Sequence, residues 1–402
     1  MNKIAIVLSA FGALLLTSGQ LQALTEKQVS HFDAETLEVK SAKEDTLSTS
    51  ITLDINSKIL SENRKVLVHL PEGYKDSNKT YPVLYVLDGN RHFPHARLST
   101  QILQQQNLVP DMIIVAITNN RGTRTRDLSA EQLTFNQFIT DELFPIIQLR
   151  FRASEIRTLF GHSMAGYFAT NVLAKSPAMF DNYISASPVF QINDRHIVKA
   201  FKQLQLPNSL KRSLYFTLTD AVVEGKAAGD AMAEFVDSLS LSSPKGLNWK
   251  YDFIPNQVHM TTPYVTLYEG LTFVFSDFQA PKIASLDDYN KIGGLAGINA
   301  HYKQRAIKYG VPPVVPERTI RRIGFTLLDQ GHAEDALTLL KTNVADNPNS
   351  LRALNALAST YEELNQVNKA IKTYNQALVL AKQQSSPAQQ HFQTQLKRLT
   401  DA

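Results

Sequence analysis

The stretch Thr158-Leu159-Phe160-Gly161-His162-Ser163-Met164-Ala165-Gly166 decides the fold of the larger part of this chain. It passes from an apolar run that ends at Phe160, typical of a buried strand, to a helical pattern that begins at Tyr167. A serine on a sharp turn from strand to helix has an exposed hydroxyl, and only small residues fit beside it. Ala165 stands where a second glycine is usual and still meets this size limit. We therefore predict that Ser163 is a nucleophile; the simpler alternative is a Gly-Ser turn without chemistry.

Further apolar runs lie on both sides of this stretch and alternate with helical patterns. With the run described above, they occupy residues 51–55, 66–70, 83–87, 112–117, 158–160, 183–186, 214–218 and 249–254. Several are short and continuous, as expected of strands buried on both faces. The alternation predicts an α/β domain over residues 45–280, with a mostly parallel sheet and helices on both of its faces.

A serine hydroxyl needs a base within hydrogen-bond reach before it can attack a substrate. In folds of this kind the acid and then the histidine follow the serine along the chain. His196 precedes every candidate acid, whereas His259 lies in a loop just after the last predicted strand, so His259 is the predicted base. The acid should follow the last strand but one, where Asp220 and Glu224 both stand. The residues alone leave this choice open.

An oxyanion hole needs two backbone N–H groups directed at the charge that develops during the reaction. Met164, the residue after the nucleophile, supplies one of them. The second must come from a loop after an earlier strand, and Asp88-Gly89-Asn90 fits because glycine allows a tight turn. The alternative is that Asp88-Gly89 is a turn and nothing more.

Three features of the sequence carry a resemblance to a known family: the run Pro82-Val83-Leu84-Tyr85-Val86-Leu87-Asp88-Gly89, the element Gly161-His162-Ser163-Met164 and the later His259. With these features the chain resembles the putative-esterase (esterase D-like) family of α/β-hydrolases. The resemblance covers about residues 45–280. It implies ester hydrolysis through a Ser-His-acid triad and assigns the second oxyanion N–H to Asn90.

The same resemblance bears on the acid. The secreted mycolyltransferases of the family use a Glu a few residues past the strand, which favours Glu224 over Asp220 here. Some siderophore esterases of the family work without a recognisable acid, so a Ser–His dyad remains an alternative. The resemblance also leaves open hydrolysis of a ferric-siderophore trilactone, or acyl transfer, instead of hydrolysis of a simple ester.

A basic loop follows the strand at 112–117. The family's Arg-Asp-Leu sequence matches Arg126-Asp127-Leu128, and Arg121 and Arg124 precede it. The loop belongs to the carboxyl-end side of the sheet, where ligands bind in such folds. These arginines are weak candidates for binding an anionic substrate, and a solvated run of charges is the favoured interpretation.

The C-terminal region, residues 316–402, repeats itself at an offset of 34 residues. Small residues align with small ones, large with large and turn-formers with turn-formers: Ile323 with Leu357, Gly324 with Ala358, Leu327 with Tyr361, Gly331 with Asn365 and Ala336 with Ala370. A helix-turn-helix repeat of this length resembles the tetratricopeptide family. We expect the region to bind a protein partner, to self-associate, or to dock on the first domain.

Residues 281–315, rich in Gly and Pro, are predicted to be a linker. A protein that only binds a partner through these repeats is the non-enzymatic alternative.

The N-terminus and the composition limit the location and the partners. Lys3, an apolar run and a small-residue site at Ala23 predict a cleaved signal peptide over residues 1–23, and hence a periplasmic or secreted protein. No later run is long enough to span a membrane.

The chain has no cysteine, and its 41 basic and 37 acidic residues form no basic block. We therefore expect neither disulfides nor nucleic-acid binding. No cluster has metal-ligand spacing, so no metal or cofactor is expected.

Overall fold

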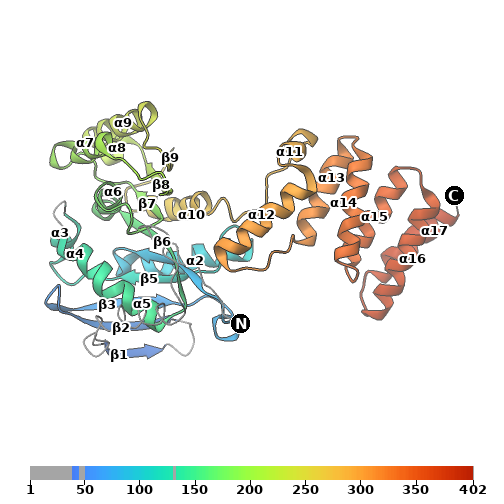
Figure 1. Cartoon of the computed structure of the whole chain (residues 1–402), viewed down its shortest axis with the longest axis horizontal. Coiled ribbons are helices and arrows are strands. Elements are labelled where there is room, and N and C mark those ends of the chain that lie inside the picture. Colours follow the sequence, from blue (N-terminus) through green and yellow to red (C-terminus); the bar gives the residue numbers. More distant parts are fainter. Residues whose placement is uncertain (1–38, 45–49, 130–132, 402) are drawn as a thin grey trace, which may run out of the picture. The chain divides into compact units, whose positions relative to one another are not determined.

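The computed structural model describes residues 39–44, 50–129 and 133–401 (Figure 1). These form two compact units: the first ends at Phe275 and the second begins at Ser276. The predicted signal peptide, residues 1–23, lies outside the described residues.

Within the described residues the first unit contains one sheet of nine strands, in the order β1-β2-β3-β5-β4-β6-β7-β8-β9. In chain order the strands are β1 (Val39–Glu44), β2 (Ser50–Ser57), β3 (Glu62–His69), β4 (Tyr81–Val86), β5 (Ile113–Ile117), β6 (Ala153–His162), β7 (Asn182–Ala186), β8 (Arg212–Leu218) and β9 (Leu247–Phe253). Strands β4 to β9 run parallel to their neighbours within that group, and β1, β2 and β3 extend the sheet antiparallel at one edge. The predicted mostly parallel sheet is therefore confirmed, and β2 to β9 coincide with the apolar runs of the sequence.

Helices cover both faces of this sheet (Figure 1). On one face, α2 (Gly89–Gln105) and α10 (Thr262–Val274) pack on each other and on the strands. Side chains of the other face, such as Tyr85, form the main hydrophobic core with helices that include α5 (Phe144–Arg150), α6 (Met164–Lys175), α7 (His196–Gln203) and α9 (Lys226–Leu241). Shorter elements complete the unit: η2 (Tyr74–Asp76), α3 (Arg124–Leu128), α4 (Leu133–Gln137), the π-helix η3 (Phe138–Leu143), η4 (Asn193–Arg195) and α8 (Ala221–Glu224).

In its described residues the second unit is all-helical, with α11 (Leu286–Lys291), α12 (Gly294–Tyr309), α13 (Glu317–Asp329), α14 (Ala333–Asp346), α15 (Leu351–Glu363), α16 (Val367–Gln383) and α17 (Gln389–Thr400). Helix α15 begins 34 residues after α13, and α16 begins 34 residues after α14. The turn after the first helix of each pair contains the aligned residues Gly331 and Asn365, both with positive φ (82° and 54°). The repeat inferred from the sequence is thus present as two successive helix pairs.

The predicted linker, residues 281–315, differs from the expectation because it contains α11 and α12. Its glycines precede and begin α12 instead of preventing a helix, since Gly293 is the N-cap and Gly294 the first helical residue. Ile298 and Tyr302 of α12 are buried against Ile323 of α13 in one hydrophobic cluster. The segment is therefore part of the helical unit and covers the apolar face of the first repeat.

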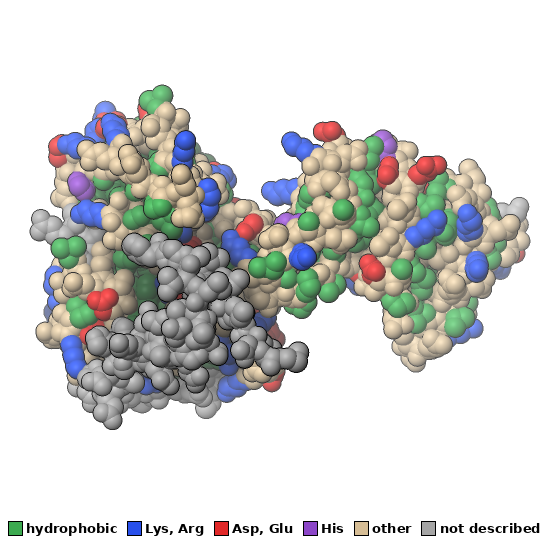
Figure 2. All heavy atoms as spheres, in the orientation of Figure 1, with side chains coloured by type: hydrophobic (Ala, Val, Ile, Leu, Met, Phe, Trp, Pro, Cys, Tyr) green, Lys and Arg blue, Asp and Glu red, His purple; other side chains and the backbone are tan. Residues whose placement is uncertain are grey.

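The other end of the repeat array is covered by α17, whose Phe392 is buried with Tyr374 of α16. Hydrophobic side chains still reach the surface of the helical unit (Figure 2). Val379 of α16 and Ile307 of α12 are among the exposed ones. The unit therefore covers both ends of its short repeat array with its own helices and keeps apolar side chains on its surface.

Candidate active site

Ser163 lies on the turn between β6 and α6, in a backbone conformation that amino acids with a side chain rarely adopt (φ 61°, ψ −118°). Its N–H donates to the carbonyl oxygen of Ala186 in β7 (2.9 Å), and its own carbonyl accepts from Tyr167 N–H (2.9 Å). A Cβ atom at Gly161 would lie 2.1 Å from the oxygen of Ala165, so this position accepts only glycine. The tight packing holds Ser163 half-exposed at the carboxyl end of β6.

The two loops predicted to supply oxyanion donors follow neighbouring strands. Strands β4 and β6 are paired, and the Leu87 N–H donates to the carbonyl of Phe160 (3.0 Å), so the chain beyond each strand emerges at the same edge. Met164 is the first residue of α6 and Asn90 the second residue of α2. Backbone N–H groups in the first turn of a helix have no intrahelical partner. Both N–H groups are therefore available to an oxyanion, and the macrodipoles of the two helices favour negative charge there.

Asp88, the N-cap residue of α2, anchors the first of these loops. Arg124 donates to both of its carboxylate oxygens, from Nε (2.7 Å) and Nη2 (2.8 Å), and Asn119 donates to the same carboxylate. Burial favours the neutral acid, but Arg124 and Asn119 outweigh it and hold the pKa of Asp88 below its usual value. A Cβ atom at Gly89 would lie 2.7 Å from the backbone of Ala116, so the loop is also packed tightly against β5.

This anchor changes the interpretation of the basic loop. Arg124 donates to Asp88 from Nε and Nη2, and Arg126 is paired with Glu62 and Asp127, although both guanidinium groups stay partly exposed. Of the three candidate arginines, Arg121 alone is exposed without an ion-pair partner among the described residues. Nearby carboxylates thus compete for the guanidinium groups of two of the three, and substrate binding by this loop stays a weak prediction.

The structure brings His259 and Glu224 together. Nδ1 of His259, in the loop after β9, lies 2.7 Å from Oε2 of Glu224 at the end of α8. The side chain of Glu224 is buried, with 5% exposed, and that of His259 is 31% exposed. Asp220, the other candidate acid, instead accepts a hydrogen bond from the backbone N–H of Asn256 (3.3 Å). His196 begins α7 and is not among the hydrogen-bond partners of this pair.

The environment of Glu224 favours its ionised form. Burial raises the pKa of this carboxyl, but the hydrogen bond from His259 and the nearby hydroxyl of Ser187 outweigh the effect and hold it below the usual value. An ionised carboxylate at Nδ1 keeps the proton on that nitrogen, which leaves Nε2 of His259 free to accept a proton.

The hydrogen bonds of the described residues do not include one between Ser163 Oγ and His259. The two residues are linked instead through His162, the neighbour of Ser163. Its ring lies 4.6 Å from the His259 ring between centroids, and its Nε2 is 2.8 Å from the His259 carbonyl oxygen. Sequence reasoning assigned no role to His162, although it stands inside the quoted serine motif.

Two more histidines behind the site were also missed. His92 and His95 of α2 are buried, and Nδ1 of His92 lies 3.0 Å from Nε2 of His95. The ring of His92 lies 5.6 Å from that of His162, edge to face. Their spacing of three along a helix was the available signal, because it places both side chains on one face. In the described part of the chain, no group of three or more His, Cys, Asp or Glu residues is arranged to hold a metal ion.

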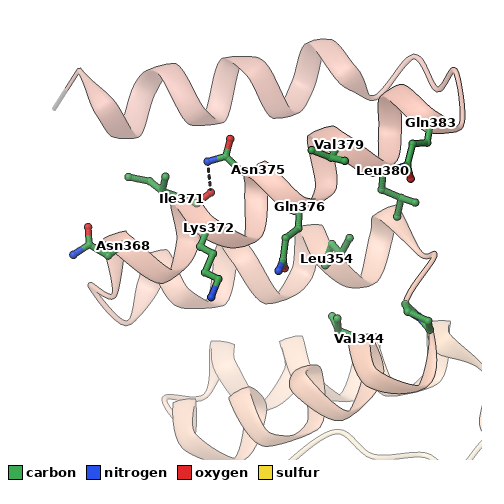
Figure 3. A pocket seen from close by; sticks show the side chains of 11 residues that line it. Val344, Leu354, Asn368, Ile371, Lys372, Asn375, Gln376, Val379, Leu380 and Gln383 are labelled. Atoms are coloured by element: carbon green, nitrogen blue, oxygen red, sulfur yellow. Dashed lines mark hydrogen bonds between the residues drawn. The ribbon is translucent and has the colours of Figure 1, made fainter.

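The second unit has a groove of its own, between α14, α15 and α16 (Figure 3). Ile371, Val379 and Leu380 give it an apolar floor, and Asn375 and Lys372 are among its polar residues. Asn375 Nδ2 donates to the Ile371 carbonyl (3.0 Å), as the dashed line shows. Lys372 is the one titratable residue in its lining, so the groove has no set of groups for acid–base catalysis.

Comparison with known families agrees with the two units. Residues 57–232 match the family described as "Putative esterase", and residues 327–396 match a tetratricopeptide repeat. Over these residues the first unit resembles the putative-esterase family. The match includes Ser163, Glu224 and the Asp88-Gly89-Asn90 loop, and the enzyme is accordingly an esterase.

Individual relatives carry related names. The chain is 24% identical over 227 residues to the ferri-bacillibactin esterase BesA of Bacillus subtilis (strain 168). The aligned region covers 48% of this chain and 78% of that protein. An IroE-like serine hydrolase from Shewanella oneidensis shares the fold (TM-score 0.53, 23% identity, 74% of this chain and 98% of that one). The siderophore hydrolase EstB from Aspergillus nidulans does so too (TM-score 0.52, 22% identity, 60% of this chain and 100% of that one). No helix among the described residues is long and apolar enough to cross a membrane.

Proposed function

We propose that this esterase hydrolyses a carboxylic ester through an acyl-enzyme formed on Ser163. Ser163 Oγ attacks the ester carbonyl carbon while His259 Nε2 takes the hydroxyl proton. The tetrahedral oxyanion is held by the N–H groups of Met164 and Asn90. His259 then gives its proton to the leaving alcohol, and a water molecule, activated by the same histidine, releases the acid.

The contact of 2.7 Å between His259 Nδ1 and Glu224 Oε2 is the observation that carries this proposal. A buried, ionised carboxylate stabilises the imidazolium that forms when His259 accepts the serine proton. It also fixes the tautomer in which Nε2 can act as the base. Hydrogen bonds between nucleophile and base are often long in free enzymes and shorten when substrate binds, so the separation of Ser163 from His259 is compatible with this role.

The test is turnover of p-nitrophenyl acetate by the purified chain, together with covalent labelling by diisopropyl fluorophosphate. We expect turnover, and a phosphoryl adduct on the peptide that contains Ser163. Ser163→Ala should lose both, and a triad nucleophile is typically worth about 10⁴–10⁶ in turnover. A label on a different residue, or turnover by Ser163→Ala within about tenfold of the parent chain, would contradict the assignment.

A ferric-siderophore ester is the second candidate substrate. It is supported by the names of BesA and EstB and by the exposed Arg121, whose loop adjoins the oxyanion loop through the Asn119–Asp88 hydrogen bond. An exposed cation beside the site would attract an anionic substrate and leave a neutral one unaffected.

Arg121→Ala should therefore lower kcat/KM for a ferric tricatecholate trilactone about three- to tenfold, an effect that added salt weakens, with p-nitrophenyl acetate unchanged. Arg150→Ala, which removes an exposed arginine just before the amino end of β6, is the matched control. Equal effects of the two substitutions on the anionic substrate would exclude a local role for Arg121.

The location and the partner are further proposals. The apolar N-terminus with its small-residue site at Ala23 supports export to the periplasm or beyond. The tetratricopeptide repeat supports binding of a protein partner or of a second copy by the helical unit. N-terminal sequencing of the mature chain and its mass in solution test these two points separately.

A further inference from the structure

The backbone carbonyl of His259 accepts two hydrogen bonds from buried side chains. His162 Nε2 lies 2.8 Å from this oxygen and Thr262 Oγ1 lies 3.0 Å from it. A carbonyl oxygen can only accept, so the proton of the neutral His162 ring is on Nε2. Together these two donors form what we call the His259 clamp.

The clamp is buried, whereas the loop it holds is exposed. His162 and Thr262 are 2% and 0% exposed, while Pro255, Val258 and Met260 lie on the surface. A short exposed loop is mobile unless its polar groups are tied to a rigid part of the fold. His162 ends β6 and Thr262 begins α10, so the loop is tied to two elements of the core.

The hydroxyl of Ser187 extends the clamp. Ser187 Oγ donates to Thr262 Oγ1 (2.9 Å), which leaves the Thr262 proton for the His259 carbonyl. Ser187 also lies beside Glu224, so its single proton has two acceptors, Thr262 Oγ1 and that carboxylate, and the hydroxyl contributes to lowering the pKa of Glu224. The groups that hold the backbone of His259 and the group that orients its ring therefore belong to one polar cluster.

His162 is adjacent to Ser163 in the chain, so its hydrogen bond connects the serine turn directly to the histidine loop. We propose that His162, helped by Thr262, is a positioning residue: it sets the place of His259 relative to Ser163 through the His259 clamp. This inference rests on the proposed function of Ser163 and His259. It goes beyond it in assigning the position of the base to the histidine of the serine motif.

Two substitutions separate this role from simple packing. In His162→Gln the side-chain amide nitrogen falls near the former Nε2 and can still donate to the carbonyl. In His162→Asn the amide nitrogen falls near the former Nδ1 and cannot reach it. Both replace the ring by an uncharged amide, so each controls for loss of the ring.

We expect His162→Asn to lower kcat for p-nitrophenyl acetate about 10- to 100-fold with KM nearly unchanged, since a displacement of about 1 Å of a catalytic group can cost this much. His162→Gln should recover most of the loss. Equal values of kcat for the two variants would overturn the proposal. If His162→Asn does not fold, Thr262→Val and Thr262→Ser form a second pair, of which only the serine variant keeps the donor and should keep kcat.

A measurement without substrate distinguishes failure of this inference from failure of the proposed function. In the chain labelled with ¹⁵N-histidine, the Nδ1–H proton of His259, bonded to Glu224, should give a downfield resonance that is retained in His162→Gln and lost or broadened in His162→Asn. Absence of ester turnover by the parent chain would contradict the proposed function, and this resonance would still test the clamp. An unchanged resonance in His162→Asn would overturn the clamp even if turnover is normal.

Discussion

Nδ1 of His259 and Oε2 of Glu224 are separated by 2.7 Å, although the two residues are 35 positions apart in the chain. Asp220 is the N-cap residue of α8 and Glu224 is the last residue of the same short helix. The fold thus distinguishes two carboxylates that have nearly the same local sequence environment. The buried one contacts the histidine, and the other supports the backbone of its loop.

This difference predicts unequal effects of two conservative substitutions. Glu224→Gln removes the charge that would stabilise the imidazolium of His259, and we expect kcat to fall about 10²–10⁴-fold, by analogy with loss of the orienting carboxylate in other triads. Asp220→Asn can still accept from the Asn256 N–H, and its effect should be less than about tenfold. Steady-state kinetics on p-nitrophenyl acetate measure both. The reverse ranking would make Asp220 the acid, and two mild effects would favour a dyad.

The backbone of Ser163 predicts an effect on stability that is independent of activity. Its positive φ of 61° strains any residue with a Cβ atom, at a cost of about 1–3 kcal/mol, and glycine avoids most of this cost. Glycine also makes the unfolded chain more flexible, which lowers the stability of the folded state by about 0.4–1 kcal/mol and offsets part of this gain. Ser163→Gly should therefore be more stable than Ser163→Ala by about 1 kcal/mol, although both are inactive. Urea denaturation followed by the fluorescence of Trp249 measures the difference, and a less stable glycine variant would argue against strain at this turn.

Much of the architecture could be predicted because it depends on local patterns. Continuous apolar runs predicted the buried strands, and the small residues around Ser163 indicated the close packing of β6 and α6. The 34-residue repeat of the sequence predicted the two helix pairs. Each of these signals lies within one element or between elements adjacent in the chain.

Other features depend on contacts that no local pattern records. The residues alone left Asp220 and Glu224 open as the acid, and the family resemblance was needed to favour Glu224, because the position of the His259 loop decides which carboxylate is reached. The hydrogen bond from His162 to the His259 carbonyl spans 97 residues. The helix α12 was overlooked because Gly293 and Gly294 indicate a break, and its cap and its burial against α13 become visible only in the folded unit.

The role of Arg124 can be separated from substrate binding by kinetics. If it anchors Asp88, then Arg124→Ala should loosen the loop that presents the Asn90 N–H. We expect kcat for a neutral ester to fall by about 10-fold or more, because a displaced oxyanion donor is costly. Arg126→Ala breaks pairs with Glu62 and Asp127 only and should leave kcat nearly unchanged, so it is the control. A raised KM at constant kcat in Arg124→Ala would instead indicate a direct contact with substrate.

The buried histidines predict that the first unit loses stability in mild acid. Burial, with repulsion from neighbouring imidazoles and from Arg91 around His92, lowers the pKa of His92 to about 3; burial lowers that of His95 to about 4. Burial and the proximity of His259 lower the pKa of His162 to about 4, against the opposing effects of Asp88 and Glu224.

In the unfolded chain each of these histidines titrates near the ordinary value of about 6.5. Between about pH 6.5 and pH 4 the unfolded chain therefore binds more protons than the folded one, and stability must fall as the pH falls. The contribution of the cluster is complete above about pH 6.5 and is lost as the pH approaches 4. Since one unit of pKa shift corresponds to about 1.4 kcal/mol, three buried histidines make this loss substantial.

Urea denaturation between pH 7.5 and pH 4.5, followed by Trp249 of β9, tests this dependence in the first unit, because Trp249 is the single tryptophan of the chain. We expect the unfolding free energy to decrease steadily across this range. His95→Gln removes one titrating group of the cluster and should flatten the slope. His391→Gln removes an exposed histidine of the second unit and should not change it. A slope that is the same in all three proteins would mean that the cluster is already hydrated or protonated in the folded state, and that burial does not keep it neutral.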